Sequence, residues 1–180
     1  MSRENFKVGG QMIEIRTVDL EDAQKLVDIY RPYVEETAIT FDYEVPNIHE
    51  FEEKISKTMQ KYPFLVAVEN KKILGYTYAG EFYPKRAYDW TAEITIYLDK
   101  QARGKGIGEL LYNELEKQLI EKGICRLTSC ISYPDEGSIS FHEKHNFRKV
   151  AHFEKVGYKF NRWYDVVWYQ KDIQEKEFIE

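Results

Sequence analysis

Three alternate glycines, Gly104, Gly106 and Gly108, interleave with two cations, Arg103 and Lys105. Glycine lets several backbone N–H groups converge on one anion, and a helix that starts here adds the positive end of its dipole. The spacing is not that of a Walker loop, because no Gly-Lys-Ser/Thr follows a four-residue spacer, and it does not match the dinucleotide fingerprint. A structural turn without a ligand stays an alternative, but the pattern predicts a turn that binds a pyrophosphate.

The elements on either side of this turn would position it. Residues 92–98 alternate and are rich in β-formers, which predicts a strand. Lys122 and Gly123 place a cation and then a glycine where a helix would end. Between the turn and that end, apolar residues follow the spacing of a helix buried on one face, at Leu110, Leu111, Leu115, Leu119 and Ile120.

The turn contains the pattern Gln101-x-x-Gly104-x-Gly106 directly after the predicted strand. This pattern resembles the acetyl-CoA signature, Gln/Arg-x-x-Gly-x-Gly/Ala, of the GNAT superfamily of N-acetyltransferases. In that family the turn holds the pyrophosphate of CoA, and the preceding strand pairs with its pantetheine arm. The resemblance therefore implies acetyl-CoA as the cosubstrate. The contacts that it implies from this stretch are Ile96, Tyr97, Leu98, Gln101, Arg103, Gly104, Lys105, Gly106, Ile107, Gly108 and Glu109.

The composition is typical of a single soluble domain that needs no disulfide or metal for its stability. A chain of 180 residues can bury a sizeable core. No apolar run approaches the roughly 18 residues of a membrane span, and a net charge of −5 disfavours nucleic acid as a partner. Cys125 and Cys130 would lie on opposite faces of a strand, too far apart for a bridge, so we expect reduced thiols and a cytoplasmic protein.

The order of the predicted elements indicates the fold class. We expect a loose tail over residues 1–11, a single N-acetyltransferase domain over 12–172 and a C-terminal tail over 173–180. Within the domain the order is β-α-α-β-β-β-α-β-α-β-β, which is the order of the GNAT fold. The class is α+β, with a mixed, largely antiparallel seven-stranded sheet flanked by helices on both faces.

Two helices are expected before the central strands. The first runs from Asp19 to about Tyr33, and Pro32 is expected to kink it or to end it early. The second begins in capping-box fashion at Asn47, with Glu50 three residues later.

Glu93 is the candidate general base. A lysine-like amine has a pKa of about 10.4, and its deprotonation at pH 7 costs roughly 4.6 kcal/mol. A carboxylate near the amine, often through a water molecule, can accept that proton. Glu93 lies at the start of the strand that leads to the turn, so it could face the acetyl group. The alternative is an exposed strand carboxylate without a chemical role.

The segment 138–147 resembles the GNAT helix whose pattern ends in Leu-Tyr-Glu-Lys-x-Gly-Phe. His142 stands where the family tyrosine often protonates the leaving thiol, and a histidine can do such work near neutral pH. The alternative is a histidine that only packs and hydrogen-bonds. The helix would add Asp135, Ser138 and Lys144 to the cofactor contacts, although Asp135 replaces a family asparagine that bonds the CoA arm. A metal site is not expected, because His142 and His145 do not form His-Glu-x-x-His.

Further motifs resemble one branch of the family, the phosphinothricin acetyltransferases. They include Ala87-Tyr88-Asp89-Trp90-Thr91-x-Glu93, Phe141-His142-Glu143 and Trp163-x-Asp165-Val166. That branch acetylates the α-amine of phosphinothricin, methionine sulfone or methionine sulfoximine, usually as a homodimer. The resemblance makes Glu93 the base. It implies substrate contacts from Phe41, Arg86, Ala87, Tyr88 and Glu93, with Tyr83 and Trp163 as further possible walls of the pocket.

Two other functions remain open from the sequence. A module that binds CoA without turnover would need neither Glu93 nor His142. A GNAT enzyme that acts on a peptide, a polyamine or an antibiotic amine would share the cofactor turn and differ in its acceptor site.

Overall fold

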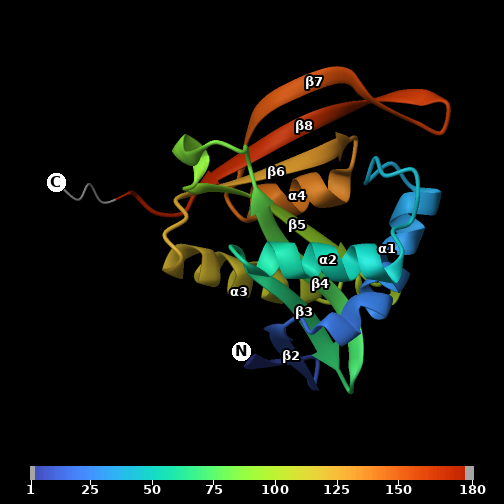
Figure 1. Ribbon diagram of the computed structural model, residues 1–180, viewed down its shortest axis with the longest axis vertical. Helices are drawn as coiled ribbons and strands as arrows, with labels where there is room; N and C mark the ends of the chain where they lie inside the picture. Colours follow the sequence, from blue (N-terminus) through green and yellow to red (C-terminus); the bar gives the residue numbers. More distant parts are fainter. Residues whose placement is uncertain (1–2, 177–180) are drawn as a thin grey trace. The chain divides into compact units, whose positions relative to one another are not determined.

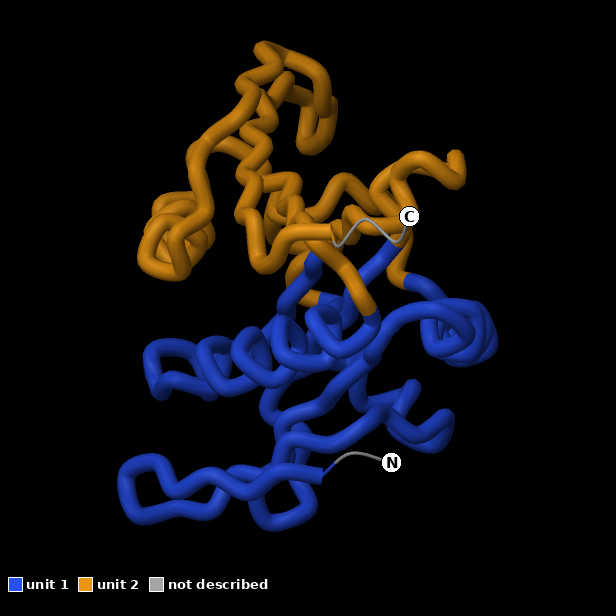
Figure 2. The backbone as a smooth tube through the Cα atoms, turned by 90° about the vertical axis from the view of Figure 1, so that its left-hand side faces the viewer, with its two compact units in different colours: residues 1–31, 46–80, 94–122 blue, residues 32–45, 81–93, 123–180 orange. Residues whose placement is uncertain are grey.

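The computed structural model describes residues 3–176. These residues group into two compact units, each assembled from separate stretches of the chain (Figure 2). The expectations for residues 1–2 and 177–180 lie outside the described residues, and the single domain over 12–172 stays a prediction. Unit 1 comprises residues 1–31, 46–80 and 94–122, and unit 2 comprises residues 32–45, 81–93 and 123–180.

Within the described residues, eight strands follow the order β1-β2-β3-β4-β5-β6-β8-β7 in one sheet. The β5–β6 pair is parallel, whereas the β1–β2, β2–β3, β3–β4, β6–β8 and β7–β8 pairs are antiparallel. The predicted α+β class with a mixed, largely antiparallel sheet is therefore confirmed. The strands, labelled where there is room in Figure 1, are β1 (Arg3–Val8), β2 (Gln11–Thr17), β3 (Phe64–Glu69), β4 (Lys72–Glu81), β5 (Thr91–Leu98), β6 (Arg126–Tyr133), β7 (Arg148–Lys159) and β8 (Arg162–Asp172).

The strand that the sequence did not predict is β1. The expectation of a loose segment before residue 12 and of seven strands is wrong, because Arg3–Val8 pairs with β2 from Arg3↔Arg16 to Val8↔Gln11. Gly9 and Gly10 form the two-residue turn of this hairpin, with φ of 55° and 86°. A Gly-Gly pair between two short alternating runs is a hairpin signal, and it was present in the sequence.

The helices are α1 (Ala23–Glu36), α2 (Ile48–Met59), α3 (Ile107–Glu121) and α4 (Glu136–Lys144). The predicted capping box of α2 is confirmed, because Asn47 Oδ1 accepts from the Glu50 N–H (3.0 Å) and the Asn47 N–H donates to Glu50 Oε2 (2.8 Å). An early end of α1 at Pro32 is wrong, since the helix continues to Glu36. The Thr37 hydroxyl donates to the Tyr33 carbonyl (2.7 Å), which stabilises the turn beyond the proline.

In unit 1, α3 packs against β2 and β3 and begins directly after the glycine turn. Its buried face includes Ile107, Leu111, Leu115 and Leu119. The predicted helix is confirmed with a slightly rotated buried face, because Ile120 is 37% exposed. This packing fixes the direction of the helix start and hence of the turn.

In unit 2, β6, β8 and β7 form an antiparallel set whose two faces differ. Residues that pair directly across strands point to the same face, and successive residues alternate. Tyr169 of β8 meets α4, where its hydroxyl donates to Glu143 Oε1 (2.9 Å), so this side is named the α4 face. Trp168 and its partner Cys130 therefore point to the opposite side.

Candidate active site

The turn before α3 has the backbone geometry that the sequence predicts. Gly104 and Gly106 have φ of 72° and 77°, the left-handed region that favours glycine, and Gly106 is the N-cap of α3. A Cβ atom at either position would meet no atom within 4 Å. The left-handed backbone at these two positions therefore favours glycine, whereas no neighbouring atom excludes a side chain. Open space lies at the start of the helix.

The other predicted cofactor contacts of unit 1 divide into exposed and buried residues. Lys105 and Arg103 are exposed beside the turn, whereas Ile107 is buried, so any contact from Ile107 is made by its backbone. The Tyr97 ring packs edge-on against Tyr30, with centroids 4.9 Å apart. Tyr97 is half-buried, and contact through its backbone would suit a strand that pairs with a pantetheine arm. Ile96, Leu98 and Glu109 are half-buried and Gly108 is buried, and their contacts with a cofactor stay predictions.

Glu93 lies in the parallel β5–β6 ladder, opposite Thr128. Its side chain is partly buried, and burial raises the pKa of the carboxyl above its ordinary value. Burial and the neighbouring Glu93 charge raise the pKa of the Cys130 thiol to about 12. Cys130 is two residues beyond Thr128, so it shares the face of Glu93, and its raised pKa keeps it a neutral thiol. Within residues 3–176, no hydrogen bond to the Glu93 carboxylate occupies it.

Aromatic side chains extend the face that carries Glu93 and Cys130. Cys130 pairs with Trp168, whose ring meets Phe82 edge-on at a centroid distance of 5.8 Å. Phe82 in turn meets Tyr88 at 5.7 Å. This side of unit 2 is named the Glu93 face. It brings the predicted base and the predicted substrate residue Tyr88 to the same side of the sheet.

Arg86, Ala87 and Tyr88 form a short 3-10 helix between β4 and β5. Tyr88 anchors it, because its ring also meets Tyr83 edge-on at 5.5 Å. Arg86 and Ala87 are exposed. The loop thus exposes the guanidinium group of Arg86 on a short helix that the ring contacts of Tyr88 hold in place.

Phe41 reaches the Glu93 face from the loop after α1. Its ring lies against Gly157 of β7 and near Tyr164 of β8, with a ring-centroid distance of 6.1 Å to the latter. Gly157 pairs with Tyr164, which shares the face of Trp168 because the two are four residues apart on β8. Trp163 points to the opposite face and is 57% exposed, so its expected place in the pocket wall is wrong.

The contact between Phe41 and Gly157 gives a first prediction. A Cβ on Gly157 would lie 2.3 Å from Phe41 Cζ, so Gly157→Ala must displace the ring. We expect a loss of about 1–3 kcal/mol of unfolding free energy, measured by urea denaturation. Phe41→Leu in the same chain should restore part of it. Gly80→Ala is the matched control, since its Cβ would meet nothing within 4 Å. Equal effects of the two glycine substitutions would contradict the packing.

His142 lies apart from the Glu93 face. It is 7% exposed, and its ring centroid is 6.4 Å from that of Tyr169 on the α4 face. Its Nδ1–H donates to the Ser138 carbonyl (2.7 Å), and burial lowers the pKa of the imidazole below its ordinary value. A neutral ring with this bond offers Nε2 as an acceptor. The geometry therefore favours a packing or positioning role, and a role in proton transfer stays a prediction.

The buried imidazole has a consequence for stability. As pH falls below about 6.5, the unfolded chain binds a proton at this position before the folded protein does, so stability decreases toward acid. His142→Gln should flatten the pH dependence of the unfolding free energy below pH 6.5, by at most about 1.4 kcal/mol per pH unit. Urea denaturation between pH 5 and pH 8 measures this. Parallel curves for variant and wild type would contradict it.

The start of α4 explains the aspartate at position 135. Asp135 Oδ1 accepts from the Ser138 N–H (3.1 Å) and caps the helix. An aspartate does this as well as an asparagine, so the replacement leaves the helix start intact. Lys144, at the other end of α4, is exposed.

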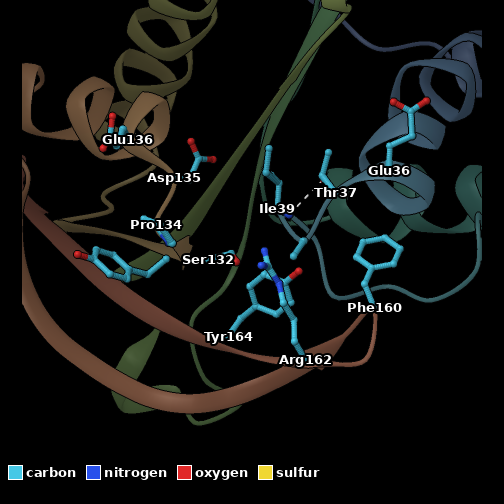
Figure 3. Close-up of a pocket in the computed structure, with 12 residues that line it drawn as sticks. Glu36, Thr37, Ile39, Ser132, Pro134, Asp135, Glu136, Phe160, Arg162 and Tyr164 are labelled. Atoms are coloured by element: carbon cyan, nitrogen blue, oxygen red, sulfur yellow. Dashed lines mark hydrogen bonds between the residues drawn. The ribbon is translucent and has the colours of Figure 1, made fainter.

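Three structural features of unit 2 were missed by sequence reasoning. Lys159 is 3% exposed, and its ammonium donates to the carbonyls of Thr37 and Thr40 at 2.8 Å each. The Tyr43 hydroxyl donates to the Tyr158 carbonyl, which adds a second tie between this loop and the β7–β8 hairpin. A cavity of about 540 Å³ lies beside them, lined by residues 36–39 and 132–136 and by Phe160, Arg162 and Tyr164 (Figure 3).

No group of three or more His, Cys, Asp or Glu side chains in residues 3–176 is placed to hold a metal ion. No helix of this part of the chain is long and apolar enough to cross a membrane. Cys125 and Cys130 are both free thiols.

Comparisons with known proteins show the family to which the chain belongs. Residues 15–168 match the family model described as an acetyltransferase (GNAT) domain. The phosphinothricin N-acetyltransferase of Streptomyces coelicolor is 34% identical over 169 residues, which cover 92% of this chain and 99% of that protein. The methionine sulfoximine/methionine sulfone acetyltransferase of Salmonella typhimurium is 28% identical, with 89% and 95% covered.

A solved structure gives the same result for the fold. The phosphinothricin acetyltransferase of Sinorhizobium meliloti in complex with acetyl-CoA superposes with a TM-score of 0.87 at 29% identity, covering 90% of this chain and 89% of that one. The family match spans most of the chain, and the relatives are matched over most of their own length. The chain therefore belongs to the GNAT family of N-acetyltransferases, in its phosphinothricin and methionine sulfoximine acetyltransferase branch.

Proposed function

We propose that this N-acetyltransferase transfers the acetyl group of acetyl-CoA to the α-amine of a small amino acid or analogue, of the phosphinothricin, methionine sulfone or methionine sulfoximine type. The observation that carries the proposal is the placement of Glu93, a partly buried carboxylate of raised pKa on the same face as Tyr88 and Phe41. A base of raised pKa holds the amine's proton more firmly than an exposed carboxylate does.

The reaction is a direct attack. Glu93 accepts a proton from the ammonium group, directly or through water, and the neutral nitrogen attacks the carbonyl carbon of the thioester. The new C–N bond forms, the C–S bond breaks, and CoA leaves as the thiolate, which takes up the proton that the attacking nitrogen loses as it becomes the amide. His142 would aid this last step by positioning. In unit 1, the positive end of α3 and the backbone N–H groups of residues 104–109 would hold the pyrophosphate.

Recognition of the acceptor rests on the 3-10 helix at Arg86. Its exposed guanidinium suits the α-carboxylate, which must lie close to the amine because both are attached to one carbon. Phe41 and Tyr88 suit the methylene chain. The proposal includes a homodimer, which is supported by exposed apolar side chains on the β7–β8 hairpin such as Phe153, Val156 and Trp163. It also includes a cytoplasmic location, which is supported by the free thiols.

A thiol-release assay with acetyl-CoA tests the acceptor class. The panel contains phosphinothricin, methionine sulfone, methionine sulfoximine, methionine, the methionine sulfone carboxamide, spermidine, an aminoglycoside and a peptide with a free N-terminus. We expect the free amino acids to give the highest kcat/KM. The carboxamide should have a lower kcat/KM because its KM is higher. Higher turnover of peptide, polyamine or antibiotic would move the acceptor to another class. Release with none of them would favour a CoA-binding module.

A further inference from the structure

Trp168 of β8 lies on the Glu93 face, within reach of a small molecule bound at Glu93. Glu93 lies opposite Thr128 on β6. Cys130 is two residues beyond Thr128 and pairs with Trp168 on β8. Neighbouring strands are about 4.8 Å apart and rise about 3.3 Å per residue, so the Cα atoms of Glu93 and Trp168 are roughly 12 Å apart. Both side chains point to the same face, and the distance between them suits one small molecule.

Small side chains flank the indole on both neighbouring strands. Its partner on β6 is Cys130 and its partner on β7 is Ala151, and neither is long enough to cover an indole ring. The side chain of Cys130 is exposed, whereas Ala151 and Trp168 are half-buried. A ligand between Glu93 and the indole would therefore lie over Cys130, with no bulky side chain of these paired residues in its path.

The indole is anchored by other rings, and the surface beside it is uncharged. Phe82, which follows β4, meets the Trp168 ring edge-on with centroids 5.8 Å apart, and Phe82 in turn meets Tyr88 at 5.7 Å. These contacts join the indole to the short 3-10 helix that contains Tyr88. Cys130 is a neutral thiol, because its pKa is raised to about 12. Methyl groups and sulfur atoms pack favourably against such a surface.

We propose that Trp168 is a specificity-determining residue of the acceptor site, and that its indole packs against an apolar end of the acceptor's side chain. The inference rests on the proposed function and deepens it. With the amine at Glu93, an extended amino-acid side chain lies over Cys130 and spans the distance to the indole. A terminal methyl group gains dispersion contacts there, whereas a terminal polar group loses its bound water without a new partner.

A matched pair of acceptors tests this contact. Methionine sulfone ends in a methyl group, and homocysteine sulfonamide has an amino group in its place, with the same length, the same sulfonyl oxygens and no added charge. We expect the wild-type kcat/KM to favour the sulfone about tenfold, mainly through KM, because the amino group is desolvated against the indole. In Trp168→Ala this preference should fall below about threefold, because the apolar surface is removed. Trp168→Phe keeps an aromatic ring without the indole N–H and should keep most of the preference.

Trp163→Ala is the matched control, because it removes the same kind of side chain from the opposite face of β8. It should leave the preference within about twofold of wild type. A loss of folded protein lowers the rates with both acceptors equally, so the ratio of the two kcat/KM values reports contact rather than stability. An unchanged preference in Trp168→Ala, or an equal loss of preference in Trp163→Ala, would overturn the inference while acetyl transfer stands.

Fluorescence separates this inference from the proposed function. The chain has three tryptophans, so Trp90→Phe combined with Trp163→Phe leaves Trp168 as the only indole. We expect methionine sulfone to shift the Trp168 emission to shorter wavelength and to protect it from quenching by acrylamide, because the ligand excludes water from the ring. If the wild-type protein acetylates neither acceptor, the proposed function fails, and this titration then decides. A saturable shift supports the contact even in that case, and an unchanged emission overturns it.

Discussion

Glu93→Gln is expected to lower kcat by about 10²- to 10⁴-fold near pH 7 while acetyl-CoA binding stays as in wild type. Glutamine has nearly the same shape but cannot accept the amine's proton, so the loss falls on the chemical step. The defect should shrink as pH approaches the pKa of the acceptor amine, because the neutral nucleophile then forms without a base. Steady-state kinetics of thiol release between pH 6 and pH 10 measures both effects.

The wild-type profile adds a second test of the same residue. Because burial raises the pKa of Glu93, its acid limb should lie at higher pH than an exposed glutamate would give. Glu154→Gln, at an exposed carboxylate on β7, is the control and should leave the profile unchanged. A Glu93→Gln enzyme with full activity at pH 7 would remove Glu93 from the mechanism.

Gly106→Asp is expected to weaken acetyl-CoA binding about 100-fold. The position has φ of 77° and forms the N-cap of α3, so a carboxylate here would lie where the structure leaves room for a diphosphate. Like charges a few ångströms apart repel by several kcal/mol at the effective dielectric of a protein surface. Calorimetric titration with acetyl-CoA measures the affinity.

Gly106→Asn is the matched control for the turn. Asparagine has the same size as aspartate and also tolerates a left-handed backbone, so it reports the steric effect without the charge. We expect it to bind acetyl-CoA about tenfold more tightly than Gly106→Asp does. Equal affinities for the two variants and the wild type, with unchanged thermal unfolding, would show that the pyrophosphate binds elsewhere.

The parts of this molecule that the sequence predicted are those with local signals. The turn at Gly104 and Gly106 and the helix after it follow from the φ preferences of glycine and from apolar periodicity, and both are present in unit 1. The capping box at Asn47 is equally local. By contrast, the hairpin formed by β1 was missed because its strand is short and half-exposed, although Gly9-Gly10 marked its turn.

The features that could not be predicted depend on contacts between residues far apart in the chain. Lys159 donates a hydrogen bond to the Thr37 carbonyl across a sequence separation of 122 residues, and no local pattern near either residue predicts this hydrogen bond. The cavity around Arg162 depends on the register of β7 with β8 and on the loop after α1, neither of which composition specifies. The resemblance to a family made Glu93 the candidate base, which stays a prediction, whereas the side of the sheet on which His142 lies could be seen only in the structure.

The most direct test of the central claim is the identity of the acetylated product. The protein is incubated with acetyl-CoA labelled with carbon-13 in the acetyl carbonyl, together with methionine sulfone labelled with nitrogen-15 at the α-amine, and the mixture is followed by NMR. We predict that the thioester signal decreases while a new amide carbonyl signal, coupled to the α-nitrogen, grows at the same rate. In Glu93→Gln we expect this amide signal to be absent. Thioester that persists, or acetate without amide, would contradict the assignment of acetyl transfer to an α-amine.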